Sequence, residues 1–155
     1  MDIDKQYDKI YRYCYFRLHD MQSAQDITQE TFLRFFKQNP NLEHSKELPY
    51  LYTIAKNLCI DEFHKKAVDS LEEGVEIDGP YFDKSEDLIN SITLRATIEK
   101  LKPEEKELLF LRYVNEISVA SICKIMGMSR FAVYRRLSKV LKKLKEELMK
   151  EGFFE

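Results

Sequence analysis

The apolar positions in the C-terminal third of the chain recur with the period of a helix. From residue 129 onward they are three or four residues apart, and at about 100° per residue they form one continuous stripe. These positions are Val133, Leu137, Val140, Leu141, Leu144 and Leu148. A shorter apolar run ends before them at Gly127, which tolerates a positive φ, and Ser129 can cap the long helix. The pattern predicts a helix-turn-helix.

The side of the long helix opposite this stripe is basic. Between Lys124 and Lys145 the sequence holds eight Lys or Arg residues and no Asp or Glu. A helix with one apolar and one uniformly basic side fits a DNA groove. A solvated face or a membrane-surface helix is the alternative. Neither of these needs the preceding short helix and glycine turn, so we favour DNA binding.

The N-terminal part of the chain shows the same helical period. A first helix is predicted from Tyr7 to about Leu18. A second should begin at Ser23, because Asp26 three residues later resembles a capping box, and run to about Gln38. The residues that would face the core from the first helix are Ile10, Tyr11, Cys14, Tyr15 and Leu18.

The second predicted helix has an unusual outer face. Its inner side is formed by Ala24, Ile27, Thr31, Phe32 and Phe35. On the opposite side a leucine stands among acids and an amide, and this set comprises Asp26, Gln29, Glu30 and Leu33. An isolated exposed leucine needs no explanation, but a docking patch for a partner helix would have the same composition.

A third helix is predicted from about Tyr50 to Lys66, after an irregular polar loop from Asn39 to Pro49. Its inward positions are Leu51, Ile54, Ala55 and Leu58. Its outer side combines aromatic, amide and basic groups, namely Tyr50, Thr53, Lys56, Asn57, His64 and Lys65. Such groups can stack on and hydrogen-bond to single-stranded bases, although an ordinary surface is equally compatible with them.

Charge divides the chain into three parts. Residues 1–66 carry ten basic and ten acidic side chains, residues 67–93 carry one and eight, and residues 94–155 carry fourteen and nine. Helical periodicity is absent from residue 67 to about residue 84, which indicates an acidic linker. We therefore predict one domain over residues 1–66, a linker over 67–87 and a second domain over 88–155.

The second domain should contain two helices before the helix-turn-helix. One is expected from about Ser85 to Leu101. Another should begin at Pro103, because its missing N–H costs nothing in a first turn and the acids that follow meet the positive helix end. This helix should run to about Val114. We expect it to bury Leu108, Leu111 and either Tyr113 or Val114.

Composition supports an all-α fold and gives no sign of an enzyme. The 155 residues include only four glycines and four prolines. So few turn residues favour a helical protein over one with many turns. Cys14, Cys59 and Cys123 lie far apart and are expected to be core thiols, and no ligand spacing or phosphate loop suggests a metal or cofactor. With no apolar run of about 20 residues and no apolar segment near Met1, we expect a cytoplasmic protein without membrane insertion.

Three segments together resemble one family. They are Ala24–Arg34, Tyr50–Asp61, and the run from Leu101-Lys102-Pro103 into the helix-turn-helix. Their order and spacing are similar to those of bacterial sigma-70 factors of the extracytoplasmic-function (ECF) type. Residues 5–66 resemble sigma region 2, and residues 88–150 resemble region 4.

The resemblance implies roles for the residues singled out above. Asp26, Gln29, Glu30 and Leu33 would bind the β′ clamp helices of core RNA polymerase. The −10 promoter element would be opened and read by Tyr50, Thr53, Lys56, Asn57, His64 and Lys65. The −35 element would be read by Ser129, Arg130, Phe131, Tyr134, Arg135, Arg136 and Lys139. Region 4 would also contact the β flap, and an anti-sigma factor would hold the protein inactive.

The expected function is therefore that of a non-enzymatic sigma factor, which binds core RNA polymerase and promoter DNA and needs no cofactor or small-molecule substrate. A rival is a stand-alone, dimeric helix-turn-helix regulator, which would bind two-fold operator sites without polymerase. A third possibility is an interaction protein whose helix-turn-helix binds only protein.

Overall fold

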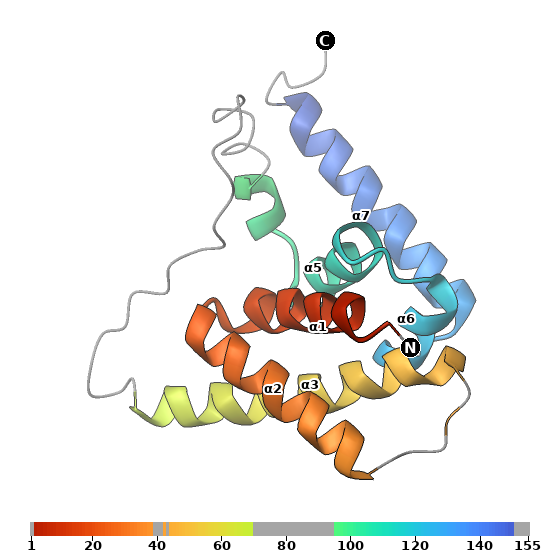
Figure 1. Ribbon diagram of the computed structural model, residues 1–155. Helices are drawn as coiled ribbons and strands as arrows, with labels where there is room; N and C mark the ends of the chain where they lie inside the picture. Colours follow the sequence, from red (N-terminus) through yellow and green to blue (C-terminus); the bar gives the residue numbers. More distant parts are fainter. Residues whose placement is uncertain (1, 39–41, 43, 70–94, 151–155) are drawn as a thin grey trace. The chain divides into compact units, whose positions relative to one another are not determined.

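The computed structural model describes residues 2–38, 42, 44–69 and 95–150, and the regular structure in these ranges is helical (Figure 1). The chain divides into two compact units, Met1–Tyr81 and Phe82–Glu155, which we call unit 1 and unit 2. Most of the predicted linker, and the start of the helix expected from Ser85, lie outside the described residues. The described helices are too short or too polar to cross a membrane.

Unit 1 consists of α1 (Ile3–Leu18), α2 (Met21–Gln38) and α3 (His44–Asp69), and each of these helices contacts the other two. At the centre, the rings of Tyr13 and Tyr52 lie edge to face with their centroids 5.0 Å apart, and both side chains are fully buried. The sequence pattern placed Tyr11 and Tyr15 inward instead, but both are half-buried. The Tyr13 hydroxyl is satisfied because Arg17 Nη1 donates to it at 3.2 Å.

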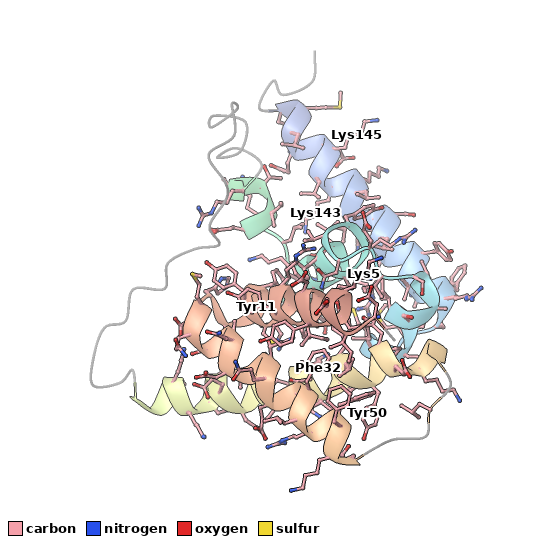
Figure 2. The ribbon with its side chains drawn as sticks, in the orientation of Figure 1. Lys5, Tyr11, Phe32, Tyr50, Lys143 and Lys145 are labelled. Carbon is pink, nitrogen blue, oxygen red and sulfur yellow. The ribbon has the colours of Figure 1, made fainter. Side chains whose placement is uncertain are left out.

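The other buried side chains of unit 1 include most of the predicted ones, but Ile27 and Ile54, which were predicted to face inward, are half-buried, and Thr28 is buried without having been predicted. These other buried side chains are Ile10, Cys14, Leu18, Ala24, Thr28, Thr31, Phe32, Phe35, Leu51, Ala55, Leu58 and Cys59. Figure 2 draws the side chains of unit 1 and labels Phe32 of α2, which is buried, and Tyr50 of α3, which is half-buried. Cys14 and Cys59 are buried as predicted, and a hydrogen bond with the Cys59 thiol lowers the pKa of Cys14.

Two helix starts in unit 1 differ from prediction. Helix α2 begins at Met21, and the carboxylate of Asp20 accepts hydrogen bonds from Ser23 N at 3.1 Å and Ser23 Oγ at 2.5 Å. Asp20 therefore satisfies a free N–H of the first turn, the role the sequence assigned to Ser23. Helix α3 begins at His44, and Pro49 lies in its second turn, where it lacks the N–H for one backbone hydrogen bond.

Unit 2 contains a helical stretch over residues 95–99, then α5 (Pro103–Leu109), η1 (Phe110–Val114), α6 (Val119–Met126) and α7 (Arg130–Lys150). Helix α7 contacts α5 and α6, and α6 also contacts η1. Pro103 starts α5 as predicted, where Lys102 N donates to Glu105 Oε1 at 3.0 Å. The core includes Leu101, Leu108, Leu111, Ile117, Ile122, Ile125, Val133, Leu137, Val140 and Leu148.

The segment after α5 corrects one prediction. Instead of continuing as an α-helix to Val114, the chain widens into the π-helical turn η1, in which Asn115 N donates to Phe110 O at 3.0 Å. A bond to the fifth preceding residue adds one residue to the turn and shifts the side chains that follow. Tyr113 and Val114 are consequently exposed, not buried, while Leu108 and Leu111 are buried as predicted.

The predicted helix-turn-helix is confirmed. Gly127 has φ +63° and ends α6, and the Ser129 hydroxyl caps α7 by accepting from Ala132 N at 3.1 Å.

Along the apolar stripe, Leu144 is only half-buried and Leu141 is 41 % exposed. Leu141 lies at the edge of the stripe, about 60° from its centre at 100° per residue, so helical period alone overestimated its burial. Cys123 was predicted to be a core thiol, but it is half-buried. It lies on the partly exposed side of the short helix α6.

Candidate interaction surfaces

The first candidate surface, the α2 face, consists of Asp26, Gln29, Glu30 and Leu33. Glu30 is half-buried and the other three side chains are exposed, with Leu33 at 65 %. Both carboxylates have partners within the helix. Gln22 Nε2 donates to Asp26 Oδ1 at 3.1 Å, and Arg34 Nε lies 2.9 Å from Glu30 Oε1. The α2 face therefore offers an exposed apolar side chain beside one acid that pairs with an arginine and one acid that is hydrogen-bonded to a glutamine.

Phe36 extends the α2 face and was missed in the sequence. It lies three residues after Leu33, so the two side chains share one side of the helix, and it is 50 % exposed. Its ring lies 5.6 Å from that of Phe35 and 6.2 Å from that of Phe32, which limits its freedom. Following the helical period one turn beyond Leu33 would have identified it.

The second candidate surface, the α3 face, consists of Tyr50, Thr53, Lys56, Asn57, His64 and Lys65. Thr53, Asn57, His64 and Lys65 are exposed, and Tyr50 and Lys56 are half-buried. Tyr50, Thr53, Asn57 and His64 lie on one side of α3, and Lys56 and Lys65, nine residues apart, flank that side in opposite directions. The Tyr50 hydroxyl donates to Gln38 Oε1 and its ring meets that of Phe35 at 5.9 Å, so this tyrosine joins α3 to α2. Phe63, half-exposed on the same helix, is a further aromatic group that sequence reasoning missed.

The third candidate surface, the α7 face, consists of Ser129, Arg130, Phe131, Tyr134, Arg135, Arg136 and Lys139. All seven are exposed, and they occupy the turn before α7 and the N-terminal half of the helix. Arg136 differs from the others because its Nη1 lies 3.1 Å from Glu104 Oε2 of α5. Within residues 95–150, no acid pairs with Arg130, Arg135 or Lys139. These three cations are available to an external anion.

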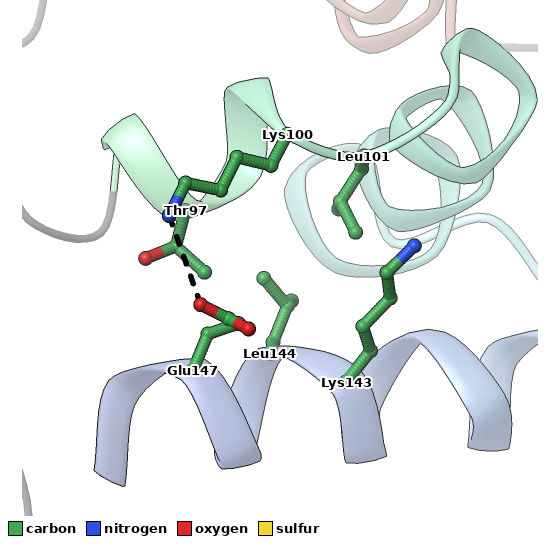
Figure 3. A pocket seen from close by; sticks show the side chains of 6 residues that line it. All are labelled: Thr97, Lys100, Leu101, Lys143, Leu144 and Glu147. Carbon is green, nitrogen blue, oxygen red and sulfur yellow. Dashed lines mark ion pairs between the residues drawn. The ribbon is translucent and has the colours of Figure 1, made fainter. Parts of the chain in front are cut away.

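The side of α7 that carries Lys143 and Glu147 is joined to the rest of unit 2 by ion pairs. Lys143 Nζ lies 3.6 Å from Glu105 Oε1, and Lys100 Nζ lies 3.7 Å from Glu147 Oε2. The backbone hydrogen bond from Lys102, with the charge of Lys143, lowers the pKa of Glu105. Figure 3 shows a cavity of about 150 Å³ here, lined by Thr97, Lys100, Leu101, Lys143, Leu144 and Glu147. Because its lysines already face carboxylates, the cavity has little attraction for an anion.

Among the described residues, no group of three or more His, Cys, Asp and Glu side chains is placed to hold a metal ion. The distinctive surfaces are instead the α2 face of unit 1, with its exposed apolar side chain, and the basic α7 face of unit 2. The capped turn between α6 and α7, followed by a long helix with free arginines in its first two turns, is the arrangement of a DNA-binding helix-turn-helix. The molecule is thus a helical protein with a DNA-binding unit.

Comparison with known proteins identifies the family. The model of "Sigma-70 region 2" matches residues 3–68, and that of "Sigma-70, region 4" matches residues 91–144. The first match covers α1–α3 and the second covers the helix-turn-helix. The chain belongs to the sigma-70 family and, by its relatives, to the ECF group.

The relatives are ECF factors of similar size or longer. The chain is 32 % identical to the ECF RNA polymerase sigma factor BldN of Streptomyces coelicolor, over 84 % of this chain and 52 % of that protein, so it spans about half of BldN. It is 28 % identical to the ECF RNA polymerase sigma factor SigW of Bacillus subtilis, over 94 % of this chain and 86 % of that protein.

A solved structure shares the fold. The sigma factor RpoE, seen in complex with the anti-sigma factor NepR from Bartonella quintana, matches with a TM-score of 0.70 at 18 % identity. The match covers 93 % of this chain and 92 % of that one. At this identity the likeness shows the fold alone.

Proposed function

We propose that this protein binds core RNA polymerase and directs promoter-specific initiation of transcription by recognising the −35 and −10 elements and aiding strand opening. One observation carries the proposal: a single chain matches region 2 over unit 1 and region 4 over unit 2. In unit 2, helix α7 also has basic residues without an acid partner among residues 95–150. In this scheme residues 1–66 form the region 2 domain, 67–87 the linker and 88–155 the region 4 domain.

Unit 1 would make the contact with polymerase and capture the −10 strand. The α2 face would dock on the β′ clamp helices, with Leu33 as its apolar anchor and the paired Asp26 and Glu30 at its rim. Burying a leucine contributes about 1.5–3 kcal/mol, more than an exposed ion pair. On the α3 face, Asn57, His64 and Lys65 would hydrogen-bond to bases or phosphates, and Tyr50, whose ring and hydroxyl contact Phe35 and Gln38 of α2, would lie beside them.

Unit 2 would bind the −35 element with the α7 face. Lysine and arginine contacts to phosphates set affinity and its salt dependence, and contacts to base edges set sequence preference. Arg130, Arg135 and Lys139 are the candidates for DNA contact. The sequence also assigned Arg136 to DNA, but its pairing with Glu104 supports a role in holding α5 against α7.

The family also implies partners that act on the factor. We propose the β flap of polymerase as a contact of unit 2 and an anti-sigma factor as the inhibitor, in line with the complex that RpoE forms with NepR. The protein would act where polymerase acts, in the cytoplasm, and as a binding subunit without chemistry of its own.

The test is run-off transcription by core polymerase, with and without the protein, on a library of randomised promoters, beside a gel shift of the protein alone. We expect transcripts from defined start sites that require the protein, and weak DNA binding without polymerase. A Leu33→Asp variant should lose the transcripts, whereas Met21→Asp, which alters an equally exposed residue outside the α2 face, should keep them. Tight binding to two-fold sites without any transcript would instead establish the stand-alone regulator.

A further inference from the structure

Two residues in the first two turns of α7 form a stack that points to a specific base. The guanidinium carbon of Arg135 lies 5.5 Å from the centroid of the Phe131 ring. The two residues are four apart and so lie on the same side of the helix. Phe131 is 74 % exposed, the largest exposure of any large apolar side chain in the described part of the chain. A phenylalanine this exposed contributes little to the core of unit 2.

The stack constrains the guanidinium without using its hydrogen-bond donors. The separation is that of a cation–π contact, in which the charge of the guanidinium is attracted to the ring and its N–H groups stay free for hydrogen-bond acceptors. The contact favours one group of rotamers of a side chain that would otherwise sample many. Arg135 is therefore biased toward Phe131, with its N–H groups available.

The neighbouring arginine shows the opposite arrangement. Arg136 directs its guanidinium to Glu104, and its Nη1 donates to Glu104 Oε2 at 3.1 Å, so its charge is paired within unit 2. No acid of residues 95–150 pairs with Arg135. The two adjacent arginines thus differ in their contacts. Arg136 pairs with an acid of another helix, whereas Arg135 can donate hydrogen bonds to an external partner.

We propose that Arg135 reads a guanine of the −35 element through paired N–H donors to O6 and N7, and that Phe131 is the residue that positions it. This inference rests on the proposed function, because it requires α7 to lie in the major groove. Guanine offers two acceptors side by side in that groove, and they match the arginine fork. Phosphate oxygens also accept paired N–H donors from arginine, but they are the same at every base pair, so only the guanine contact gives a sequence preference at one position.

The experiment is selection of transcripts by the holoenzyme from promoters with a randomised −35 element, repeated with four variants. Arg135→Lys keeps the charge but loses the fork. We expect the guanine preference at one position to fall roughly fivefold to 100-fold. Phe131→Leu keeps the apolar bulk but removes the ring face, so the same preference should fall roughly two- to fivefold. A double variant should fall no further than Arg135→Lys alone. Arg136→Ala should keep the preference, even if total transcription decreases.

The results separate this inference from the proposed function. If the wild-type protein gives no transcript, the sigma assignment fails. If it gives transcripts but Arg135→Lys lowers them for all −35 sequences equally, Arg135 contacts a phosphate and the guanine assignment is overturned. If Arg135→Lys removes the preference and Phe131→Leu does not, the positioning role of Phe131 is overturned. Melting temperatures of all variants control for loss of folding.

Discussion

The two units are built from the same kind of structure but present opposite chemistry. On α2 of unit 1, Asp26 accepts a hydrogen bond from Gln22 and Glu30 pairs with Arg34, and beside them Leu33 and Phe36 are exposed apolar side chains. On α7 of unit 2, Arg130, Arg135 and Lys139 have no acid partner among residues 95–150. An exposed apolar patch suits a protein partner, and unpaired cations suit DNA.

The difference teaches that the number of charges on a helix does not predict its partner. Helix α2 carries both acids and bases, and its Glu30 is paired with Arg34. Helix α7 uses two of its cations, Arg136 and Lys143, to hold α5 and keeps others free. Which charges remain unpaired is what distinguishes the two surfaces.

The largest expected effect concerns the core beneath the α7 face. Leu137 is 5 % exposed and Leu141, one turn later, is 41 % exposed. Leu137→Ala should destabilise unit 2 by about 2–5 kcal/mol, because it leaves a cavity. Leu141→Ala should cost less than about 1 kcal/mol. Denaturant unfolding, monitored by amide hydrogen exchange within α7, measures the free energy of unfolding of both variants. Equal losses of stability would show that Leu141 is as important to the core as Leu137.

The next effect tests the apolar character of the α2 face. Phe36→Ala should weaken the complex with core polymerase by about tenfold, because an exposed aromatic ring at an interface is a common anchor. Glu30→Gln should change the affinity by less than about threefold, since Glu30 is already paired with Arg34. Competition with a labelled sigma factor for core polymerase provides the measurement. A larger loss for Glu30→Gln than for Phe36→Ala would contradict the comparison between the units.

A smaller effect separates the free cations of α7 from the paired ones. Lys139→Ala should lower the slope of log K against log salt for promoter binding by about 0.9, as expected for one lost phosphate contact. Lys143→Ala should leave the slope unchanged, because Lys143 faces Glu105 at 3.6 Å. Filter binding of the holoenzyme at several salt concentrations measures the slope, and equal slopes for the two variants would refute the distinction.

The smallest effect is a pH dependence in unit 1. The hydrogen bond from the Ser23 hydroxyl, helped by the Ser23 N–H and Lys66, lowers the pKa of Asp20. A lowered folded-state pKa adds stability above about pH 4, and this stability is lost as the pH falls through the folded value. Asp20→Asn keeps the cap but loses the charge, so it should reduce stability by about 0.5 kcal/mol at pH 7.

Thermal unfolding of the wild type and of Asp20→Asn at pH 7 and pH 3 tests this dependence. The difference between the two proteins should shrink at the lower pH. A difference that stays constant would mean that the cap geometry matters and the charge does not. Asp20→Ala, which removes both, should be the least stable of the three at pH 7.

The helices and their order follow from the sequence alone, because helical period and turn residues are local properties. The sequence predicted the helix-turn-helix, the Pro103 start and the Ser129 cap, which the structure confirms. It missed the role of Asp20 and the early start of α3 at His44, because a cap depends on which side chain reaches a free N–H. It also missed the π turn that exposes Tyr113 and Val114.

Only the tertiary structure decided which surface groups are available. Arg135 and Arg136 are equivalent in the sequence, but packing of α5 against α7 places Glu104 beside one of them and leaves the other on the Phe131 ring. Likewise, helix packing buries Tyr13 and Tyr52 while leaving Tyr11 only half-buried. Periodicity assigns a residue to a side of its own helix, whereas pairing and burial depend on the neighbouring helix, which a local pattern does not specify.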